Sequence, residues 1–300
     1  MSLKTPDARR FAKPFFLIFE VPWNALRGRN RWGLSITNLL REFSIFDPNS
    51  GFGYRTQKKY LLESANNSFN SLTLLAHAYR KTGNRKLERF RISDLSISPL
   101  TNKLKEAFDR YGSDKATGHN YHVAYAQLLE LIQLAPNGML EIGLGSNNTK
   151  IASNMGRRAS PGASLRAFEE NTVGNLFGCD IDENALFETS RTKCFVFDQL
   201  DRESLLSLAK DWEPKLDLLI DDGLHSVTAN INSLALGLML TNDDGVIVIE
   251  DIRSNSLSVW EFIAEFVIMQ GHWAYLMEDF QGSYLFIVSK ARKIEWQFLD

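Results

Sequence analysis

From about residue 120 onward, short apolar runs alternate with longer segments whose apolar residues recur every three or four positions. The short runs are apolar throughout, which predicts buried strands, and the longer spacing predicts helices. The expected strands are Gly138–Gly143, Leu176–Ile181, Cys194–Phe197, Leu216–Ile220, Gly245–Glu250, Trp273–Glu278 and Ser283–Ser289. The expected helices are Tyr121–Leu134, Ser164–Glu170, Arg202–Trp212, Ser226–Leu240 and Ser258–Gln270.

This alternation predicts an α/β fold with a mostly parallel sheet. Strands without polar alternation suit a sheet that helices cover on both faces. Right-handed crossovers and short loops then favour a doubly wound, Rossmann-like arrangement. We expect this domain to span residues 106–300.

The N-terminal part of the chain has a different pattern. Its loop-like stretches are rich in Asn, Ser and Gly, and no strand alternation stands out. Helical spacing occurs at Ile36–Phe43, Gln57–Ala65, Leu72–Lys81 and Leu100–Tyr111. We therefore expect a smaller, mostly helical auxiliary unit over residues 1–105.

Charge divides the chain in a similar place. Residues 1–110 contain 20 Lys and Arg against 9 Asp and Glu, a net +11, whereas residues 111–300 contain 14 against 27, a net −13. Opposite charges on two units favour self-association as a homo-oligomer. The basic stretch Arg80–Arg91 is either a solvated or charge-complementary surface or a site for an anionic partner such as nucleic acid.

Membrane spans and disulfide frameworks are not expected. No apolar run approaches the ~18 residues that cross a bilayer, and Phe15–Phe19 is shorter than the ~7–15 residues of a signal-peptide core. The only cysteines, Cys179 and Cys194, lie in strand-like sequence. They indicate buried thiols in a reducing compartment, so we expect a cytoplasmic protein.

Two of the expected strands end in carboxylates. Asp221 and Asp222 follow one strand, and Glu250 and Asp251 end another. Because the carboxyl ends of parallel strands share one edge of a sheet, these acids are expected near one point. Carboxylate oxygens suit Mg²⁺, and His225, three residues after Asp222, is a candidate general base.

The preceding strand ends indicate a nucleoside ligand. Gly143 and Gly145 follow the first strand, but Asn148 stands where a dinucleotide fingerprint needs a third glycine. Asp180 ends the second strand and can bind ribose hydroxyls. Asp198 and Gln199 end the third and can bind an adenine amino group. S-adenosylmethionine, a nucleoside without phosphate, fits this set.

Residues 111–252 resemble the metal-dependent sugar O-methyltransferases of macrolide tailoring, the macrocin and mycinamicin type. The landmarks that carry the resemblance are Gly112–Lys115 with His119 and Tyr121, LEIGLG at 140–145, Gly162–Arg166, FGCDID at 177–182, Asp198-Gln199 with Asp201, IDDGLH at 220–225 and VIEDI at 248–252. The loop at Ser146–Pro161 is longer than in the family, and Leu224 stands where the family has Ser.

The resemblance implies a class I methyltransferase fold, with a seven-stranded sheet that ends in an antiparallel hairpin. It implies an S-adenosylmethionine site lined by Glu141, Gly143, Ser164, Asp180, Asp198 and Gln199, with which we group Gly145 and Asp221. It also implies that Asp222, Glu250 and Asp251 bind Mg²⁺ and that His225 is the general base. His119 and Tyr121 either contact the cofactor or acceptor or are structural.

The leading functional hypothesis is a Mg²⁺-dependent O-methyltransferase that acts on a sugar hydroxyl of a glycoside, natural product or polysaccharide precursor. One alternative is an RNA methyltransferase that docks through the basic N-terminal unit. Another is a non-catalytic module that binds the cofactor or supports assembly. Asp221 also has a structural alternative, in which it only orients its turn.

Overall fold

The computed structural model describes residues 69, 71–74, 76, 85–151, 153–156 and 160–299. Residues 71–74 are helical and overlap the start of the predicted helix Leu72–Lys81. The predicted helices Ile36–Phe43 and Gln57–Ala65 lie outside the described residues. The chain divides into two compact units, Met1–Leu74 and Leu75–Asp300, and the second unit contains the expected strands and the candidate site residues.

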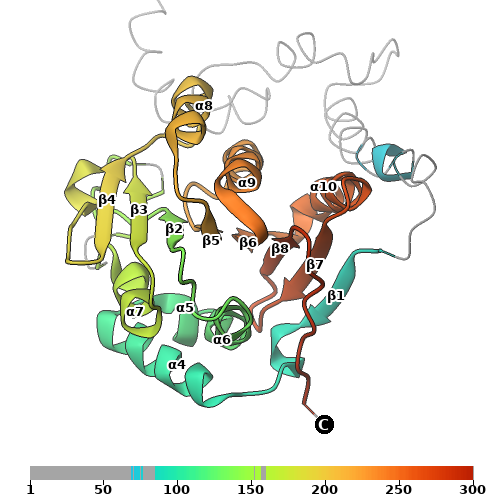
Figure 1. Cartoon of the computed structure of the whole chain (residues 1–300), viewed down its shortest axis with the longest axis horizontal. Coiled ribbons are helices and arrows are strands. Elements are labelled where there is room, and N and C mark those ends of the chain that lie inside the picture. Colours follow the sequence, from blue (N-terminus) through green and yellow to red (C-terminus); the bar gives the residue numbers. More distant parts are fainter. Residues whose placement is uncertain are drawn as a thin grey trace, which may run out of the picture. The chain divides into compact units, whose positions relative to one another are not determined.

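An eight-stranded sheet forms the centre of the second unit, with the strand order β1-β7-β8-β6-β5-β2-β3-β4 (Figure 1). Strand β8 pairs antiparallel with both β6 and β7, and the other pairings are parallel. The strands are β1 (Glu88–Arg91), β2 (Met139–Ile142), β3 (Leu176–Asp180), β4 (Thr192–Val196), β5 (Leu216–Asp221), β6 (Thr241–Ile252), β7 (Trp273–Glu278) and β8 (Tyr284–Ser289).

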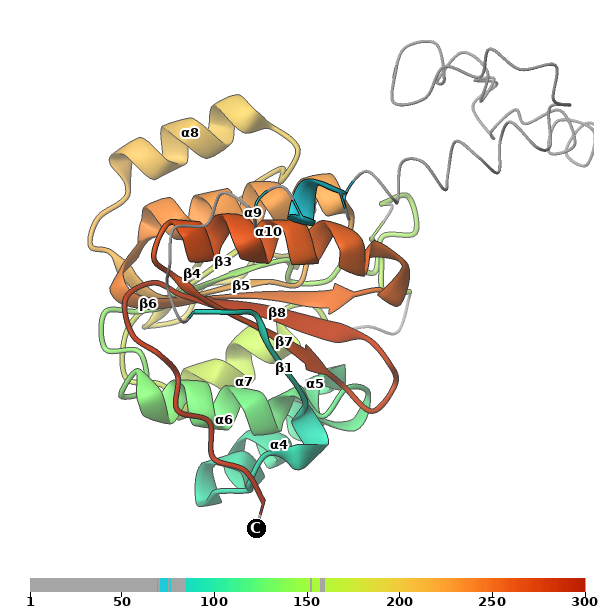
Figure 2. The same cartoon turned by 90° about the vertical axis from the view of Figure 1, so that its right-hand side faces the viewer.

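Helices cover both faces of the sheet (Figure 2). One face carries α4 (Pro99–Tyr111), α5 (Asp114–Thr117), α6 (Tyr121–Leu131) and α7 (Ala163–Asn171), and the other carries α8 (Arg202–Asp211), α9 (Val227–Leu240) and α10 (Leu257–Met269). Every residue of β2 and β5 is buried. The doubly wound architecture predicted from the apolar strands is therefore confirmed.

The eighth strand, β1, is the element that the sequence pattern missed. It pairs parallel with β7 at one edge of the sheet, and its sequence, ERFR, has no apolar run. Arg89 pairs with Glu261 at 2.6 Å and Arg91 with Glu278 at 3.4 Å. These described arginines of the basic stretch are thus paired with acids of the same unit.

The domain boundary predicted between residues 105 and 106 falls inside α4. This helix begins at Pro99, after Ser98, whose side chain accepts a hydrogen bond from the Thr101 amide at 3.3 Å. Before it, Ile92 and Leu95 are fully buried in the same core cluster as α6. The described residues from 85 onward therefore pack with the C-terminal unit.

Within the described part of the chain, no helix has both the length and the apolar character needed to cross a lipid bilayer. Cys179 and Cys194 are free thiols, the first buried and the second half-buried.

Candidate active site

The candidate site lies where β2, β3, β5 and β6 end. The loops after β2 and β5 touch, since the Asp222 amide donates to the Ile142 carbonyl at 2.8 Å. Gly143 has a φ of +91°, and a Cβ there would lie 2.2 Å from the Asp222 carbonyl oxygen. Only glycine permits this approach, which brings the acidic loop beside the predicted cofactor turn.

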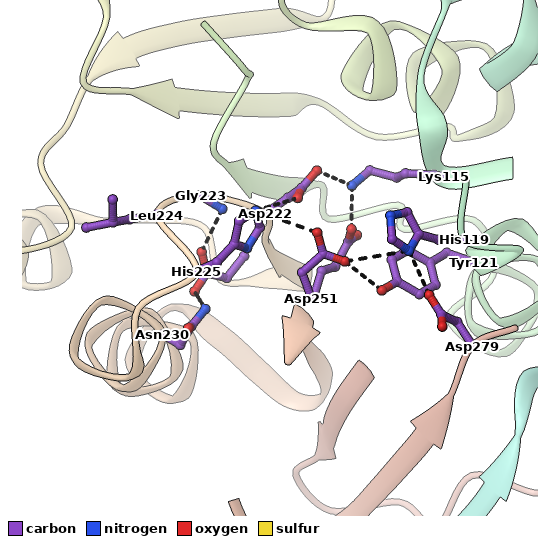
Figure 3. A network of polar contacts seen from close by, with 12 residues as sticks. Lys115, His119, Tyr121, Asp222, Gly223, Leu224, His225, Asn230, Asp251 and Asp279 are labelled. Carbon is purple, nitrogen blue, oxygen red and sulfur yellow. Dashed lines mark hydrogen bonds and ion pairs between the residues drawn. The ribbon is translucent and has the colours of Figure 1, made fainter. Parts of the chain in front are cut away.

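Three predicted residues form one group that could hold a metal ion: Asp222, His225 and Asp251 (Figure 3). His225 Nε2 lies 3.7 Å from Asp222 Oδ1 and 3.7 Å from Asp251 Oδ2. The candidate ligand atoms all lie within 4.8 Å of one another. His225 and Asp251 both have positive φ, 52° and 55°, a conformation that non-glycine residues rarely adopt and that is concentrated at functional sites.

Glu250 lies behind this group. Its side chain is only 2% exposed, and both carboxylate oxygens accept hydrogen bonds, from Lys115 at 2.7 Å and from the Tyr125 hydroxyl. The structure therefore unites two of the three predicted metal ligands with the predicted base. The third predicted ligand, Glu250, lies outside this group of three. The Lys115 ammonium connects it to Asp222, because it contacts both carboxylates.

Lys115 is a site residue to which the sequence pattern assigned no role. Its side chain is 1% exposed, and its Nζ lies 2.5 Å from Asp222, 2.7 Å from Glu250 and 3.5 Å from Glu141. Burial lowers the pKa of Lys115, but the three carboxylates outweigh it and raise the pKa well above its ordinary value. Lys115 thus carries a positive charge. The only sequence signal was its place in the landmark Gly112–Lys115.

Glu141 is fully buried at the end of β2, and neither of its carboxylate oxygens makes a hydrogen bond within the described residues. Burial raises its pKa to about 7, although Lys115 acts in the opposite direction. Its Oε1 lies 3.5 Å from Lys115 Nζ, so the partner of this buried carboxyl group within the chain is the Lys115 ammonium.

Asp251 is held by side chains at the start of α6 and just before it. The Tyr121 hydroxyl donates to Asp251 Oδ1 at 2.7 Å, and His119, stacked on Tyr121, lies beside the same oxygen. Burial raises the pKa of Asp251, but His225, the Tyr121 hydrogen bond and His119 outweigh it and place the pKa below its ordinary value. The carboxylate is therefore an ionised acceptor.

Two adjoining cavities, of about 110 and about 220 Å³, open beside these groups. Gly143, Asp180 and Gly223 line both cavities. The smaller is also lined by Gly145, Ser164, Asp222, His225 and Asp251, and the larger by Phe197, Asp198, Gln199 and Leu224. An elongated ligand could therefore reach from the ends of β3 and β4 to the acidic group.

Gln199, which lines the larger cavity, and the buried Asp221 are joined by hydrogen bonds within the protein. The Gln199 amide nitrogen donates to Asp221 at 2.6 Å and to Ser233 at 2.8 Å, and its oxygen accepts from the Leu224 amide at 2.8 Å. Asp221 is fully buried, lines neither cavity and also accepts from Asn230 at 2.9 Å. These two residues, predicted as cofactor contacts, are engaged in fixing the loop that carries Asp222 and His225.

Asp180 and Asp198 line the cleft, and their carboxylate oxygens can accept further hydrogen bonds. Asp180 accepts from the Leu144 and Asp182 amides, each at 2.8 Å, which leaves a second lone pair on each oxygen. Asp198 is exposed and accepts from the Leu200 amide at 2.8 Å through one oxygen. Both positions agree with their predicted place at the strand ends.

No family model matches the chain. Over 147 residues the chain is 30% identical to 8-demethyl-8-alpha-L-rhamnosyl tetracenomycin-C 2'-O-methyltransferase from Streptomyces olivaceus, a match that covers 49% of this chain and 36% of that relative. The fold of this chain is similar to that of the MycE methyltransferase from the Mycinamycin biosynthetic pathway in complex with Mg, SAH and Mycinamycin VI. The TM-score is 0.53 at 22% identity, over 64% of this chain and 56% of that one.

The chain has the class I methyltransferase fold. A second structure of MycE, with Mg and SAH, gives a TM-score of 0.53 at 23% identity, over 67% of this chain and 57% of that one. The methyltransferase fold predicted from the strand-end landmarks is therefore confirmed, with β1 as an additional edge strand. The chain spans only part of the length of each of these relatives.

The residues at the acidic group fit a hard divalent cation. The carboxylates of Asp222, Glu250, Asp251 and Glu141 gather near Lys115, and burial raises the pKa of Asp222, Glu250 and Glu141, so ionising all four would leave an excess of negative charge in a partly buried site. Such an excess is costly unless a cation offsets it. Oxygen donors from Asp222 and Asp251 suit Mg²⁺.

Proposed function

We propose that the protein is an S-adenosylmethionine-dependent O-methyltransferase that uses Mg²⁺ to methylate a sugar hydroxyl of a glycoside, a natural product or a polysaccharide precursor. One observation carries this proposal: the group of Asp222, His225 and Asp251 opens into the cavity that continues into the strand-end cleft. A methyl donor and an acceptor hydroxyl would meet where these two features join.

Two findings support the proposal, the ligands bound in the solved relatives and the name of the curated relative. The solved relatives were crystallised with Mg and with SAH, the product of S-adenosylmethionine. The curated relative is named for methyl transfer to a rhamnosyl 2'-oxygen. The MycE structures share their fold with this chain, and the curated relative shares 30% identity with it over 147 residues.

The cofactor would lie along the two adjoining cavities. Asp180, which lines both cavities, would accept hydrogen bonds from ribose hydroxyls, and Asp198 would accept one from the adenine amino group. Gly145 and Ser164 would surround the methionine end in the smaller cavity. The buried Glu141 carboxylate, whose pKa the neighbouring Ser164 hydroxyl lowers, would lie behind Ser164 and could offset part of the cofactor's positive charge.

Asp222 and Asp251 would hold the cation, and Glu250 would support them through Lys115. When bound, Mg²⁺ supplies charge that stabilises a developing alkoxide and lowers the pKa of the acceptor hydroxyl. His225 would take the proton from that hydroxyl as its oxygen attacks the methyl carbon. The carbon–sulfur bond of the sulfonium breaks with its electron pair left on sulfur, which gives S-adenosylhomocysteine.

The test is transfer of a labelled methyl group from S-adenosylmethionine to methyl glycosides, with Mg²⁺ and with excess EDTA. We expect turnover that EDTA abolishes, and we expect Asp222→Asn to lower it at least about 100-fold while S-adenosylhomocysteine still binds. Asp244→Asn, at an exposed acid of β6, is the matched control and should retain wild-type turnover.

Three outcomes would contradict the proposal. Full turnover in EDTA would remove the cation from the reaction. Transfer to RNA but to no glycoside would favour the RNA methyltransferase alternative. Cofactor binding without transfer to any acceptor would favour a non-catalytic module.

A further inference from the structure

The loop after β2 lines both cavities of the candidate site. This loop, Ser146–Pro161, is longer than in the family that the sequence resembles, and four of its described residues belong to the cavity walls. Ile151 lines the larger cavity, Met155 and Ser160 line the smaller, and Ser153 lines both. None of these four residues has a part in the methyl transfer proposed above.

Backbone contacts hold Met155 at the turn that follows β2. Its amide donates to the Ser146 carbonyl at 2.8 Å, and Ser146 forms a β-bridge with Asn154. The Ser146 hydroxyl in turn donates to the buried Asp182 carboxylate, just after β3. The position of Met155 is therefore tied to the strand ends that carry the proposed cofactor residues.

The side chain of Met155 lies on Gly145. This glycine has a φ of +78°, and a Cβ at its position would lie only 2.2 Å from the Met155 sulfur. The thioether thus occupies the space that a side chain at position 145 would fill. Both residues line the smaller cavity. If the methionine end of S-adenosylmethionine lies there, Met155 covers it with an apolar surface.

Met155 is also open to reagents in solution. Its side chain is 52% exposed, and among the methionines of the described residues only Met269, at 42%, is similarly exposed. Hydrogen peroxide converts an accessible thioether to a sulfoxide. An S–O bond forms as the O–O bond of the peroxide breaks, and water leaves. The sulfur is oxidised by two electrons, and the peroxide is reduced.

We propose that Met155 is an oxidation-sensitive contact of the cofactor site and that its sulfoxide weakens cofactor binding. The sulfoxide is polar where the thioether was apolar. If the oxidised side chain turns toward solvent, the smaller cavity loses its cover, and if it stays on Gly145, a polar oxygen replaces part of the apolar wall. The inference rests on the proposed function, because it assigns a form of regulation to the same cofactor site.

The experiment measures the affinity for S-adenosylhomocysteine by calorimetric titration, before and after treatment with hydrogen peroxide that is then removed. Dithiothreitol added afterwards reverses reversible oxidation of Cys179 and Cys194 but leaves methionine sulfoxide in place. We expect the wild type to lose about fivefold or more in affinity, the size expected when a half-buried apolar side chain loses its contacts. Methionine sulfoxide reductases for both epimers should restore the affinity.

Three variants identify the residue responsible. Met155→Leu keeps an apolar side chain that cannot form a sulfoxide, so peroxide should leave its affinity unchanged. Met155→Gln carries a polar amide at the same position and should bind less tightly than Met155→Leu without any peroxide. Met269→Leu is the matched control, because it removes the other exposed methionine of the described residues. It should remain as sensitive to peroxide as the wild type.

Peptide mass spectrometry shows which methionines are oxidised. Equal peroxide sensitivity in Met155→Leu and the wild type would overturn the proposal, as would unchanged affinity in protein whose Met155 is a sulfoxide. A Met155 that stays reduced while Met269 is oxidised would also overturn it. If the untreated wild type does not bind S-adenosylhomocysteine, the proposed function fails as well, whereas binding that peroxide does not weaken contradicts only the role of Met155.

Discussion

At the residue scale, Lys115 offsets the repulsion among the carboxylates of the site. Its ammonium contacts Asp222, Glu250 and Glu141, and Asp222 and Glu250 lie on separate strand ends. Without it, these partly or fully buried acids would lack their common counter-charge. This arrangement makes the geometry of the acidic group depend on a residue from α5.

We therefore expect Lys115→Met to lower the free energy of unfolding by about 3–5 kcal/mol, the usual cost of removing one partner of a buried ion pair. Urea denaturation in EDTA measures the effect. Lys105→Met is the control, because Lys105 pairs with Asp109 at an exposed position and such pairs contribute about 0–1 kcal/mol. Equal losses in the two variants would refute the role given to Lys115.

Glu141 should make stability depend on pH. Its pKa is about 7 in the folded protein against an ordinary 4.5, so between these values the folded state binds more protons than the unfolded state. Its contribution is complete below about pH 4.5 and is lost as the pH rises through about 7, by about 3 kcal/mol in total. Relative to Glu141→Gln, the wild type should lose stability over this window.

Denaturation of both proteins in urea, without metal or cofactor, from pH 4 to pH 8 checks this expectation. A difference between them that stays constant, or that grows in favour of the wild type with rising pH, would show that Glu141 ionises normally in the folded protein.

The sequence could predict which acids lie at the strand ends, but not which side chains they contact. Asp222 and Asp251 follow apolar strands, and that position alone places them at the sheet edge. Lys115 reaches the site through the packing of α5, which no local pattern encodes. Glu250 was predicted with the metal ligands because its strand position is right, although its carboxylate contacts Lys115 and Tyr125.

At the element scale, the first strand and the segment after it belong to the same folded unit as the candidate site. Strand β1 extends the sheet beyond β7, and the fully buried Ile92 follows it directly. The long apolar strands could be predicted because burial on both faces removes polar residues. Strand β1 could not, because an edge strand keeps charged side chains that pair with neighbours instead of entering the core.

Ile92→Ala tests this assignment. It should lower the free energy of unfolding by about 2–5 kcal/mol, as for other buried large-to-small changes. Ile97→Ala, at a side chain that is 63% exposed, should change it by no more than about 0.5 kcal/mol. Urea denaturation compares the two variants. If the Ile92 variant were as stable as the Ile97 variant, the assignment of residues 85–105 to this core would be contradicted.

At the scale of the whole molecule, the class I methyltransferase fold brings two adjoining cavities and the group of Asp222, His225 and Asp251 to one edge of the sheet. The N-terminal part of the sequence is basic and the rest is acidic, and some of these opposite charges pair within one unit. Arg89 pairs with Glu261, and Arg91 pairs with Glu278. The proposed chemistry depends on a divalent cation that balances the carboxylates of the site.

Calorimetric titration of Mg²⁺ into protein saturated with S-adenosylhomocysteine tests this dependence most directly. We expect one binding site, weakened at least about tenfold in Asp251→Asn, which loses one carboxylate ligand, and unchanged in Asp244→Asn. Absence of Mg²⁺ binding in the wild type, or equal affinity in Asp251→Asn, would contradict the proposed role of the cation.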